Sequence, residues 1–285
     1  MLHAEDDAFV RELLSRHAGL AFDSQQAHLL DSRLTSLARQ QGLSGAEALV
    51  QALRSHPCGS LLENVVEALT THETSFFRDR LPFVALADAL IPELLENRPP
   101  GRGLSIWSAG CSTGQEAYSL ALLLRELFPQ LDYRQVRIHG TDVSPVTIRR
   151  ARQGRFSAAE VKRGINDKFR EKYFRREGSE FVVDASVRQM VTWSTGNLVD
   201  DWPVRGPFDV VLMRNVLIYF LPEARTKILE RLATQLARDG LLLLGASETT
   251  FGLCDAFEPH TTPCGATVYR KAQHRAASDT LRSHQ

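Results

Sequence analysis

The sequence predicts an α/β protein whose parallel, doubly wound sheet is preceded by an all-helical domain. From Leu104 onward, short apolar runs typical of buried strands alternate with amphipathic helical patterns, as in a sheet built from β–α–β units. Before that point, residues 6–75 repeat apolar side chains at three- to four-residue spacing, the pattern of packed helices. A Pro- and Gly-rich stretch at 97–101 is predicted to be a linker.

Composition and charge restrict the possible classes. The 285 residues suffice for about two domains, and 34 basic residues balance 34 acidic ones, which indicates no bulk attraction to nucleic acid or anionic membranes. The acidic N-terminus lacks the apolar stretch of a signal peptide, and no apolar run has transmembrane length. Four cysteines without a C-x-x-C pair indicate free thiols in a reducing cytoplasm. We therefore expect a cytoplasmic protein that is not inserted in a membrane.

The N-terminal region is predicted to form about four helices. Gly19, Gly42 and the segment 57–59 interrupt the apolar pattern and are expected to end helices. Arg33 and Arg39 share one predicted helix, where they belong either to a docking face or to an ordinary solvated face.

The later elements are predicted from apolar runs and their neighbours. Ser144 is expected to cap a helix that has Pro145 at its first position, and Asp239–Gly240 is expected to be a turn before a strand. The predicted elements are helix 82–96, a strand from 104 with a helix after Gly114, strands 136–141, 191–194 and 208–213, helix 222–238, and strands 241–244 and 264–270.

The region between Gly154 and Val191 breaks the alternation. Residues 181–183 and 187–191 have the pattern of short strands, separated by turns at 177–179 and 184–186. We therefore predict a small antiparallel β subdomain inserted at about residues 155–190. The predicted division is 1–80, a helical domain; 81–103, a connecting helix and linker; 104–273, the sheet domain; and 274–285, a disordered tail.

The first predicted strand ends in a glycine-containing turn, residues 109–114, that leads directly into a helix. Such a turn lets a ligand approach bare backbone and the free N–H groups of the helix start. Gly110 and Gly114 are four residues apart, so the fingerprint G-x-G-x-x-G is absent, as is the phosphate loop G-x-x-x-x-G-K-[ST]. The turn indicates a ligand other than a phosphate chain, although close packing alone also accounts for it.

Polar side chains follow the ends of several predicted strands, where ligands bind in open α/β sheets. Asp142 ends the second strand, and a carboxylate there can accept both hydroxyls of a ribose. A ribose-binding acid fits NAD or S-adenosylmethionine (SAM), and the missing pyrophosphate fingerprint favours SAM. Alternatives stay open: a structural role for Asp142, and for Glu116 a favourable position at a helix N-terminus. The set comprises Glu116, Asp142, Asn197, Arg214 and Asn215.

Longer motifs make the interpretation more specific. Residues 70–79, TTHETSFFRD, resemble the T-T-N-E-T-x-F-F-R-[DE] motif of chemotaxis receptor glutamate methyltransferases, the CheR family. Residues 214–220, RNVLIYF, resemble the R-N-V-[LM]-I-Y-F motif of that family. The run WSAGCSTGQEAYS at 107–119, and GASE at 245–248 near the family's G-H-S-E, extend the resemblance to about residues 5–271.

The resemblance implies an N-terminal helical domain, a Rossmann-like SAM-dependent methyltransferase domain and an inserted β subdomain. It also implies methyl transfer from SAM to glutamate side chains on cytoplasmic helices of chemoreceptors, which yields glutamyl methyl esters and S-adenosylhomocysteine, without a metal. Arg78 would suit the methionyl carboxylate of the cofactor, since a guanidinium binds a carboxylate bidentately. By motif position the cofactor contacts would be His72, Thr74, Arg78, Glu116, Asp142, Asn197, Leu198, Asn215 and Val216.

The expected chemistry needs no general base. A glutamate is already a carboxylate at pH 7, so positioning and removal of water suffice for its attack on a sulfonium methyl group. Tyr219 and Arg214 are the candidates for orienting the substrate carboxylate. The alternatives are core packing for Tyr219 and an ion pair across the domain interface for Arg214.

Two departures from the family pattern affect the expected function. His72 stands where the family has Asn, and an imidazole is bulkier and titratable. The loop 175–180 is short, whereas family members that bind a receptor's C-terminal pentapeptide carry a glycine-rich extension there. We predict a monomeric, pentapeptide-independent enzyme that does not act on nucleic acid. The alternatives are a non-catalytic SAM-responsive binding module of the same fold and a methyltransferase acting on a small molecule.

Overall fold

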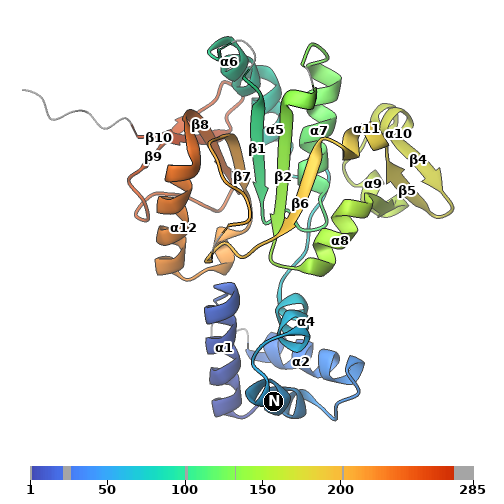
Figure 1. Cartoon of the computed structure of the whole chain (residues 1–285), viewed down its shortest axis with the longest axis vertical. Helices are drawn as coiled ribbons and strands as arrows, with labels where there is room; N and C mark the ends of the chain where they lie inside the picture. Colours follow the sequence, from blue (N-terminus) through green and yellow to red (C-terminus); the bar gives the residue numbers. More distant parts are fainter. Residues whose placement is uncertain (1, 22–26, 100–101, 132, 201, 273–285) are drawn as a thin grey trace, which may run out of the picture.

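The computed structural model describes residues 2–21, 27–99, 102–131, 133–200 and 202–272. A helical domain lies at one edge of a larger sheet domain, and a small β subdomain projects from the side of that sheet (Figure 1). Two predicted segments, the end of the linker at 100–101 and the tail 274–285, lie outside the described residues.

Four helices form the described part of the N-terminal domain, as predicted. They share one core, which includes Leu14, Leu34 and Leu49. Gly19 ends the first helix in the left-handed conformation, with φ 65°, and its N–H donates to the Ser15 carbonyl at 3.0 Å. The helices are α1 (Ala4–Ala18), α2 (Ala27–Gln40), α3 (Ala46–Ser55) and α4 (Ser60–Leu69).

Arg33 of α2 caps the end of α4. Its Nη1 donates to the carbonyls of Leu69 at 3.0 Å, Thr70 at 3.3 Å and Ala68 at 3.4 Å. The last carbonyls of a helix have no partner within the helix, so a cation there stabilises the helix end. This contact accounts for Arg33 without a docking face.

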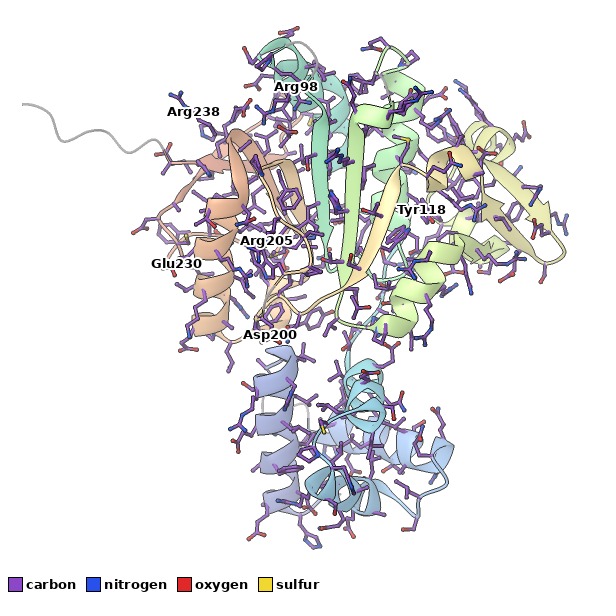
Figure 2. The ribbon with its side chains drawn as sticks, viewed as in Figure 1. Arg98, Tyr118, Asp200, Arg205, Glu230 and Arg238 are labelled. Carbon is purple, nitrogen blue, oxygen red and sulfur yellow. The ribbon has the colours of Figure 1, made fainter. Side chains whose placement is uncertain are left out.

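The connection to the sheet domain is one helical stretch with a π turn at its centre. It comprises α5 (Leu81–Ala85), η2 (Leu86–Leu90) and α6 (Ile91–Glu96), which confirms the predicted helix 82–96. Beyond it, Arg98 of the predicted linker pairs with Asp209 at 2.9 Å, and these side chains are 7% and 1% exposed. Figure 2 shows Arg98 at the edge of the sheet remote from the helical domain.

The sheet has seven strands in the order β6-β2-β1-β7-β8-β10-β9, and the first five of these are parallel. The last two form a hairpin that pairs antiparallel with β8, so the sheet is mixed. The strands are β1 (Leu104–Ala109), β2 (Val136–Asp142), β6 (Val191–Thr195), β7 (Phe208–Met213), β8 (Leu236–Leu244), β9 (Phe257–Thr261) and β10 (Thr267–Lys271).

Helices cover both faces of the sheet, as a doubly wound fold requires. Along β7, Val210 and Leu212 pack in the same core as α7, whereas Val211 and Met213 pack in the core that contains α12. This alternation follows from the two-residue period of a strand. The helices around the sheet are α7 (Gln115–Leu127), η3 (Tyr133–Gln135), α8 (Pro145–Gln153), η4 (Leu217–Tyr219) and α12 (Pro222–Gln235).

The predicted cap of α8 is confirmed. Ser144 Oγ accepts a hydrogen bond from Thr147 N at 3.0 Å, and Pro145 occupies the first helical turn. Both features depend only on neighbouring residues, so the sequence pattern sufficed to identify them.

Three predictions near the C-terminus were wrong. Helix α12 ends at Gln235 rather than 238, and Asp239–Gly240 lies inside β8, where the register against β7 shifts, so it is an irregularity of a strand and not a turn. The last strand begins at Thr267 rather than 264, and β9 was not predicted. Strand β9 contains Pro259 and is largely exposed at the sheet edge, so it carries no apolar strand pattern.

The insert contains a three-stranded antiparallel sheet of order β3-β5-β4. Strand 181–183 and the turn at Gly178 are as predicted, but 187–191 is not a separate strand. Asp184 instead accepts from Ser186 N at 2.9 Å and caps a short helix. The elements are β3 (Arg155–Ser157), α9 (Ala158–Lys162), α10 (Asp167–Tyr173), β4 (Phe174–Glu177), β5 (Glu180–Val183) and α11 (Ala185–Arg188).

Candidate active site

A pocket lies at the carboxyl edge of the sheet and is lined by residues of both the sheet domain and the helical domain. Figure 1 shows the helical domain facing this edge of the sheet. Ligands of parallel α/β sheets bind at this edge. All eleven residues that the sequence singled out line this one pocket, although their contacts with a ligand stay predictions. They are His72, Thr74, Arg78, Glu116, Asp142, Asn197, Leu198, Arg214, Asn215, Val216 and Tyr219.

The helical domain closes one side of the pocket, which the sequence did not reveal. Ala18 and Leu20 line it, and Ala21 N donates to the Tyr219 carbonyl at 2.7 Å. A Cβ on Gly19 would lie 2.4 Å from Val199 Cγ1, so only glycine fits this approach. In the sequence, Gly19 was the sign of this close contact. A glycine is also expected wherever a helix ends, so the contact could not be inferred from it.

The glycine turn after β1 is shaped by what lies against it. Gly110 has φ 73°, and a Cβ there would lie 2.5 Å from Val216 Cγ2. Ser112, with φ 50°, donates its N–H to Asp142 Oδ2 at 2.8 Å. The turn thus brings the ends of β1, β2 and β7 into contact, which explains why it needs glycine without a phosphate loop.

Asp142 is bound mainly by the protein itself. Its Oδ1 accepts from Ser144 N at 3.0 Å and Thr147 Oγ1 at 3.3 Å, in addition to the Ser112 bond on Oδ2. Three of about four acceptor positions of the carboxylate are therefore used, which leaves one on Oδ2 for a ligand hydroxyl. Burial raises the pKa of Asp142, and the hydrogen bonds and the nearby charge of His72 oppose this shift without cancelling it.

Arg214 connects three parts of the site. Its Nη1 donates to Glu116 Oε2 at 3.0 Å, and its Nη2 donates to Asp79 Oδ2 at 2.6 Å and to the Arg78 carbonyl at 2.9 Å. The side chain is 1% exposed. Ser108 Oγ supplies a second hydrogen bond to Glu116, at 2.8 Å. The pair with Asp79 links Arg214 to the segment before the sheet domain, as in the alternative of an ion pair across the domain interface, whereas the pair with Glu116 lies within the sheet domain. Substrate orientation by Arg214 stays a prediction.

The loop that carries Thr74 and Arg78 has an unusual backbone. Phe77, Asp79 and Arg80 have φ values of 48°, 63° and 43°, although none of them is glycine. Such conformations are uncommon and concentrate at functional sites. Among the described residues, the Arg78 guanidinium makes one hydrogen bond, from Nη1 to the Glu73 carbonyl at 3.0 Å. Most of its donors are therefore available to an anionic group in the pocket.

Tyr219 and Asn197 differ in how far they are engaged. Tyr219 packs against the core of the helical domain, and in the described part of the chain its hydroxyl makes no hydrogen bond. Asn197 donates from Nδ2 to the His17 carbonyl at 2.6 Å and to Asp200 Oδ2 at 2.8 Å. Both N–H groups of the Asn197 amide are therefore used, whereas the Tyr219 hydroxyl is available to a ligand.

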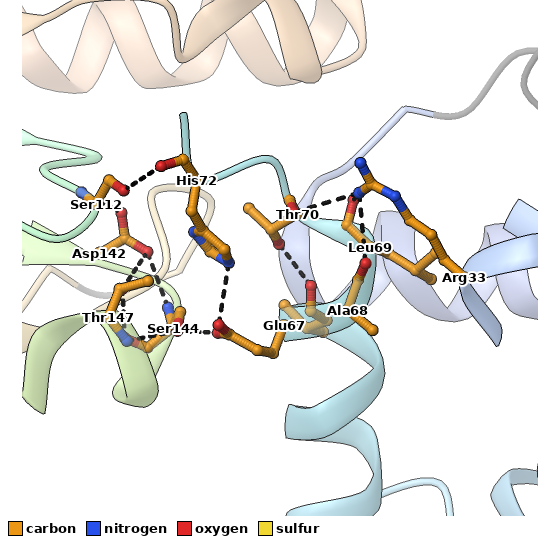
Figure 3. A network of polar contacts seen from close by, with 11 residues as sticks. Arg33, Glu67, Ala68, Leu69, Thr70, His72, Ser112, Asp142, Ser144 and Thr147 are labelled. Atoms are coloured by element: carbon orange, nitrogen blue, oxygen red, sulfur yellow. Dashed lines mark hydrogen bonds and ion pairs between the residues drawn. The ribbon is translucent and has the colours of Figure 1, made fainter. Parts of the chain in front are cut away.

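His72 belongs to a polar network between the two domains (Figure 3). Its Nε2 lies 3.2 Å from Glu67 Oε1, at ion-pair distance, and its carbonyl accepts from Ser112 Oγ at 3.0 Å. Ser144 Oγ donates to the other Glu67 oxygen. Burial lowers the pKa of His72, but contact with Glu67 and the charge of Asp142 outweigh it, so the pKa lies above its ordinary value. Burial raises the pKa of Glu67, but the contacts with His72 and Ser144 outweigh burial, so this pKa lies below its ordinary value.

The pocket also gathers unpartnered polar atoms. Among the described residues, five buried side-chain nitrogen or oxygen atoms have no hydrogen bond, and three belong to residues of the pocket. Such atoms are rare in proteins and call for an explanation. One explanation is that a polar ligand binds in the pocket and supplies the missing hydrogen-bond partners. The three atoms are His72 Nε2, which faces Glu67 Oε1 at the ion-pair distance of 3.2 Å, and Arg214 Nε and Asn215 Oδ1, which have no partner among the described residues and are the two open to a ligand.

The described residues contain no cluster of His, Cys, Asp or Glu side chains that would hold a metal. The site instead offers the free acceptor position of Asp142 to a ligand hydroxyl, and the neighbouring turn after β1 is not a phosphate loop. These two features suit a nucleoside that lacks a phosphate chain. On a Rossmann-like sheet, this arrangement belongs to the class of SAM-dependent methyltransferases.

Comparison with protein families gives a more specific assignment. Residues 72–265 match the model of the CheR methyltransferase, SAM binding domain, and residues 5–70 that of the CheR methyltransferase, all-alpha domain. The chain therefore belongs to the CheR methyltransferase family, with SAM as its cofactor. A non-catalytic module is not favoured by these findings.

Named relatives agree with the family. The chain is 36% identical over 253 residues to Chemotaxis protein methyltransferase Cher2 of Pseudomonas putida, which covers 87% of this chain and 91% of the relative. It is 37% identical over 258 residues to Chemotaxis protein methyltransferase 1 of Pseudomonas aeruginosa, which covers 89% and 93%. A solved TehB-like SAM-dependent methyltransferase from Corynebacterium glutamicum is 19% identical, with a TM-score of 0.37 over 69% of this chain and 96% of that one. That likeness is too weak to support an argument.

Proposed function

We propose that this enzyme transfers the methyl group of SAM to glutamate side chains on the cytoplasmic helices of chemoreceptors, forming glutamyl methyl esters. The observation that carries the proposal is that all eleven residues predicted from separate motifs line one pocket. The relatives named chemotaxis protein methyltransferase support the substrate class.

The residues of the pocket fit the cofactor. The remaining acceptor position of Asp142 would bind a ribose hydroxyl, and the Arg78 guanidinium would bind the methionyl carboxylate. The unpartnered Arg214 Nε and Asn215 Oδ1 lie in the same wall and offer a donor and an acceptor. When bound, the cofactor supplies a methyl group activated by its positively charged sulfur.

The transfer requires orientation more than proton chemistry. A carboxylate oxygen of the substrate forms the new bond to the methyl carbon while the carbon–sulfur bond breaks and its electron pair stays on sulfur. No proton moves, because the substrate glutamate is already ionised at pH 7. The protein orients the two groups and excludes water, and the Tyr219 hydroxyl is the candidate for holding the substrate carboxylate.

The setting of the enzyme is part of the proposal. We expect a cytoplasmic monomer, and no helix of the described residues is long and apolar enough to cross a membrane. The hairpin of β4 and β5 turns at Gly178 and Ser179, so this loop contains no glycine-rich extension. This short loop supports an enzyme that acts without docking to a receptor's C-terminal pentapeptide.

The test is methylation of receptor-containing membranes with SAM that carries a radioactive methyl group. Carboxyl methyl esters release methanol in base, so we expect base-labile label on the receptor with the native enzyme. Asp142→Asn should weaken S-adenosylhomocysteine binding about tenfold or more in calorimetry, whereas Asp255→Asn at an exposed position should not. Cofactor binding without base-labile label on any receptor would contradict the proposed substrate and favour the non-catalytic module.

A further inference from the structure

Glu248 follows β8 and reaches back toward the end of β7. Its Oε2 accepts from the N–H groups of Gly245 at 2.6 Å and Asn215 at 2.7 Å. Its Oε1 accepts from those of Val216 at 2.8 Å and Ile218 at 3.3 Å. The residue is 9% exposed. One carboxylate thus receives four backbone N–H groups from two chain segments.

The close approach of these two segments depends on this arrangement. A Cβ on Gly245 would lie 2.7 Å from Glu248 Oε2 and 2.8 Å from Asn215 N, so only glycine fits there. Asn215 itself has φ 59°, which is a left-handed conformation. Such a residue interrupts a regular strand or helix, so the neighbouring N–H groups have no partner in regular secondary structure. A buried N–H group without a partner is costly, so the segment after β7 needs an external acceptor.

We propose that Glu248 is a positioning residue that holds the segment 214–220 in its ligand-binding conformation. Glu248 does not line the pocket, whereas Asn215, Val216 and Tyr219 of this segment do. It therefore acts through the backbone: it fixes the left-handed turn at Asn215 and the start of η4, which carries Tyr219. The inference rests on the proposed function in one respect, that this pocket is where SAM binds.

The decisive variant is Glu248→Gln, which keeps the size of the side chain. The amide offers one oxygen, and its NH₂ group would face two backbone N–H donors, so two of the four hydrogen bonds are lost whichever way it is oriented. The matched control is Glu258→Gln, the same change at an exposed position on β9.

Two measurements detect the effect of Glu248→Gln on the segment 214–220. Amide hydrogen exchange of residues 215–218 should become at least about tenfold faster in Glu248→Gln and stay unchanged in Glu258→Gln. The dissociation constant for S-adenosylhomocysteine, measured by calorimetry at a temperature where both variants are folded, should rise about tenfold or more. Glu248→Asp, which keeps the carboxylate but shortens the reach, should recover part of this affinity and serves in place of Glu248→Gln if that variant does not fold.

Unchanged exchange at 215–218, or an affinity within about twofold of the native enzyme despite faster exchange, would overturn the inference. A failure of the native enzyme to bind S-adenosylhomocysteine would instead contradict the proposed function. The two failures are distinguishable, because the exchange rates need no cofactor.

Discussion

Arg214 and Glu116 form an ion pair at the wall of the pocket, with 3.0 Å between Nη1 and Oε2 and side chains that are 1% and 12% exposed. Asp79, which is 47% exposed, adds a second carboxylate to the same guanidinium. The pair joins the end of β7 to the first turn of α7, and through Asp79 to the loop before α5. Arg214 therefore holds three parts of the site together, independently of any contact with the substrate.

Removal of Arg214 should therefore destabilise the protein. Arg214→Met leaves the Glu116 carboxylate in a buried site without its cation, and breaking such a pair costs about 3–5 kcal/mol. Arg16→Met removes an exposed partner of Glu12, both 72% exposed, and should cost less than about 1 kcal/mol. The free energy of unfolding, measured by denaturant titration, compares the two. Equal losses of free energy of unfolding in the two variants would show that the buried ion pair contributes no more to stability than the exposed one.

The ion pair of His72 and Glu67 should make stability depend on pH. The pKa of His72 is raised above its ordinary value of 6.5. Its contribution is thus fully present below about pH 6.5 and is lost as pH rises through the higher folded pKa. The pKa of Glu67 is lowered below 4.5, so its own contribution persists until the pH falls through that lower pKa.

The matched comparison is with His72→Asn, which restores the residue of the family motif. We expect the native protein's advantage in free energy of unfolding over this variant to be larger near about pH 6 than near about pH 9. His260→Asn, the same change at an exposed position on β9, is the control. An advantage that is flat or grows with pH would contradict the ion pair.

Gly110 should tolerate alanine far less well than Gly42. The two glycines have nearly the same φ, 73° and 72°, but a Cβ on Gly110 would meet Val216 at 2.5 Å, whereas nothing lies within 4 Å of one on Gly42. Gly42→Ala should cost about 1–2 kcal/mol of backbone strain. Gly110→Ala should cost more and also weaken S-adenosylhomocysteine binding, as calorimetry can measure.

The clash itself can be tested by a second substitution. Val216→Ala removes both methyl groups nearest to the added Cβ, so it should recover part of the stability lost in Gly110→Ala. Additive losses in the double variant would mean that contact with Val216 is not the reason for glycine.

The short hairpin loop leads to a prediction about receptors. A peptide that ends in a receptor's C-terminal pentapeptide should show no binding in calorimetry at micromolar concentrations, because the turn at Gly178 presents no extension to hold it. Methylation of a receptor should be unaffected when its last five residues are deleted. A nanomolar or low-micromolar dissociation constant would sink this prediction.

Local patterns predicted the elements well where neighbouring residues decide them. The cap at Ser144 and strand β7, which is apolar except for Asp209, need only adjacent residues for their definition. The errors fall where distant contacts decide. Strand β9 exists because β10 pairs with it at the sheet edge, and Asp239–Gly240 stays extended because β8 pairs with β7 around a register shift. Neither partner can be read from the residues themselves.

The same division holds for the site. By itself, the sequence determined which side chains follow the strand ends, and because parallel strands end at one edge, these residues meet in a single pocket. Only the tertiary structure decided what they touch. Arg214 reaches Asp79 and Glu116 across 135 and 98 residues of chain, and Glu248 serves backbone groups about 30 residues away. Such contacts depend on the packing of whole elements, because a buried charge or N–H group must find a partner wherever the fold brings one near.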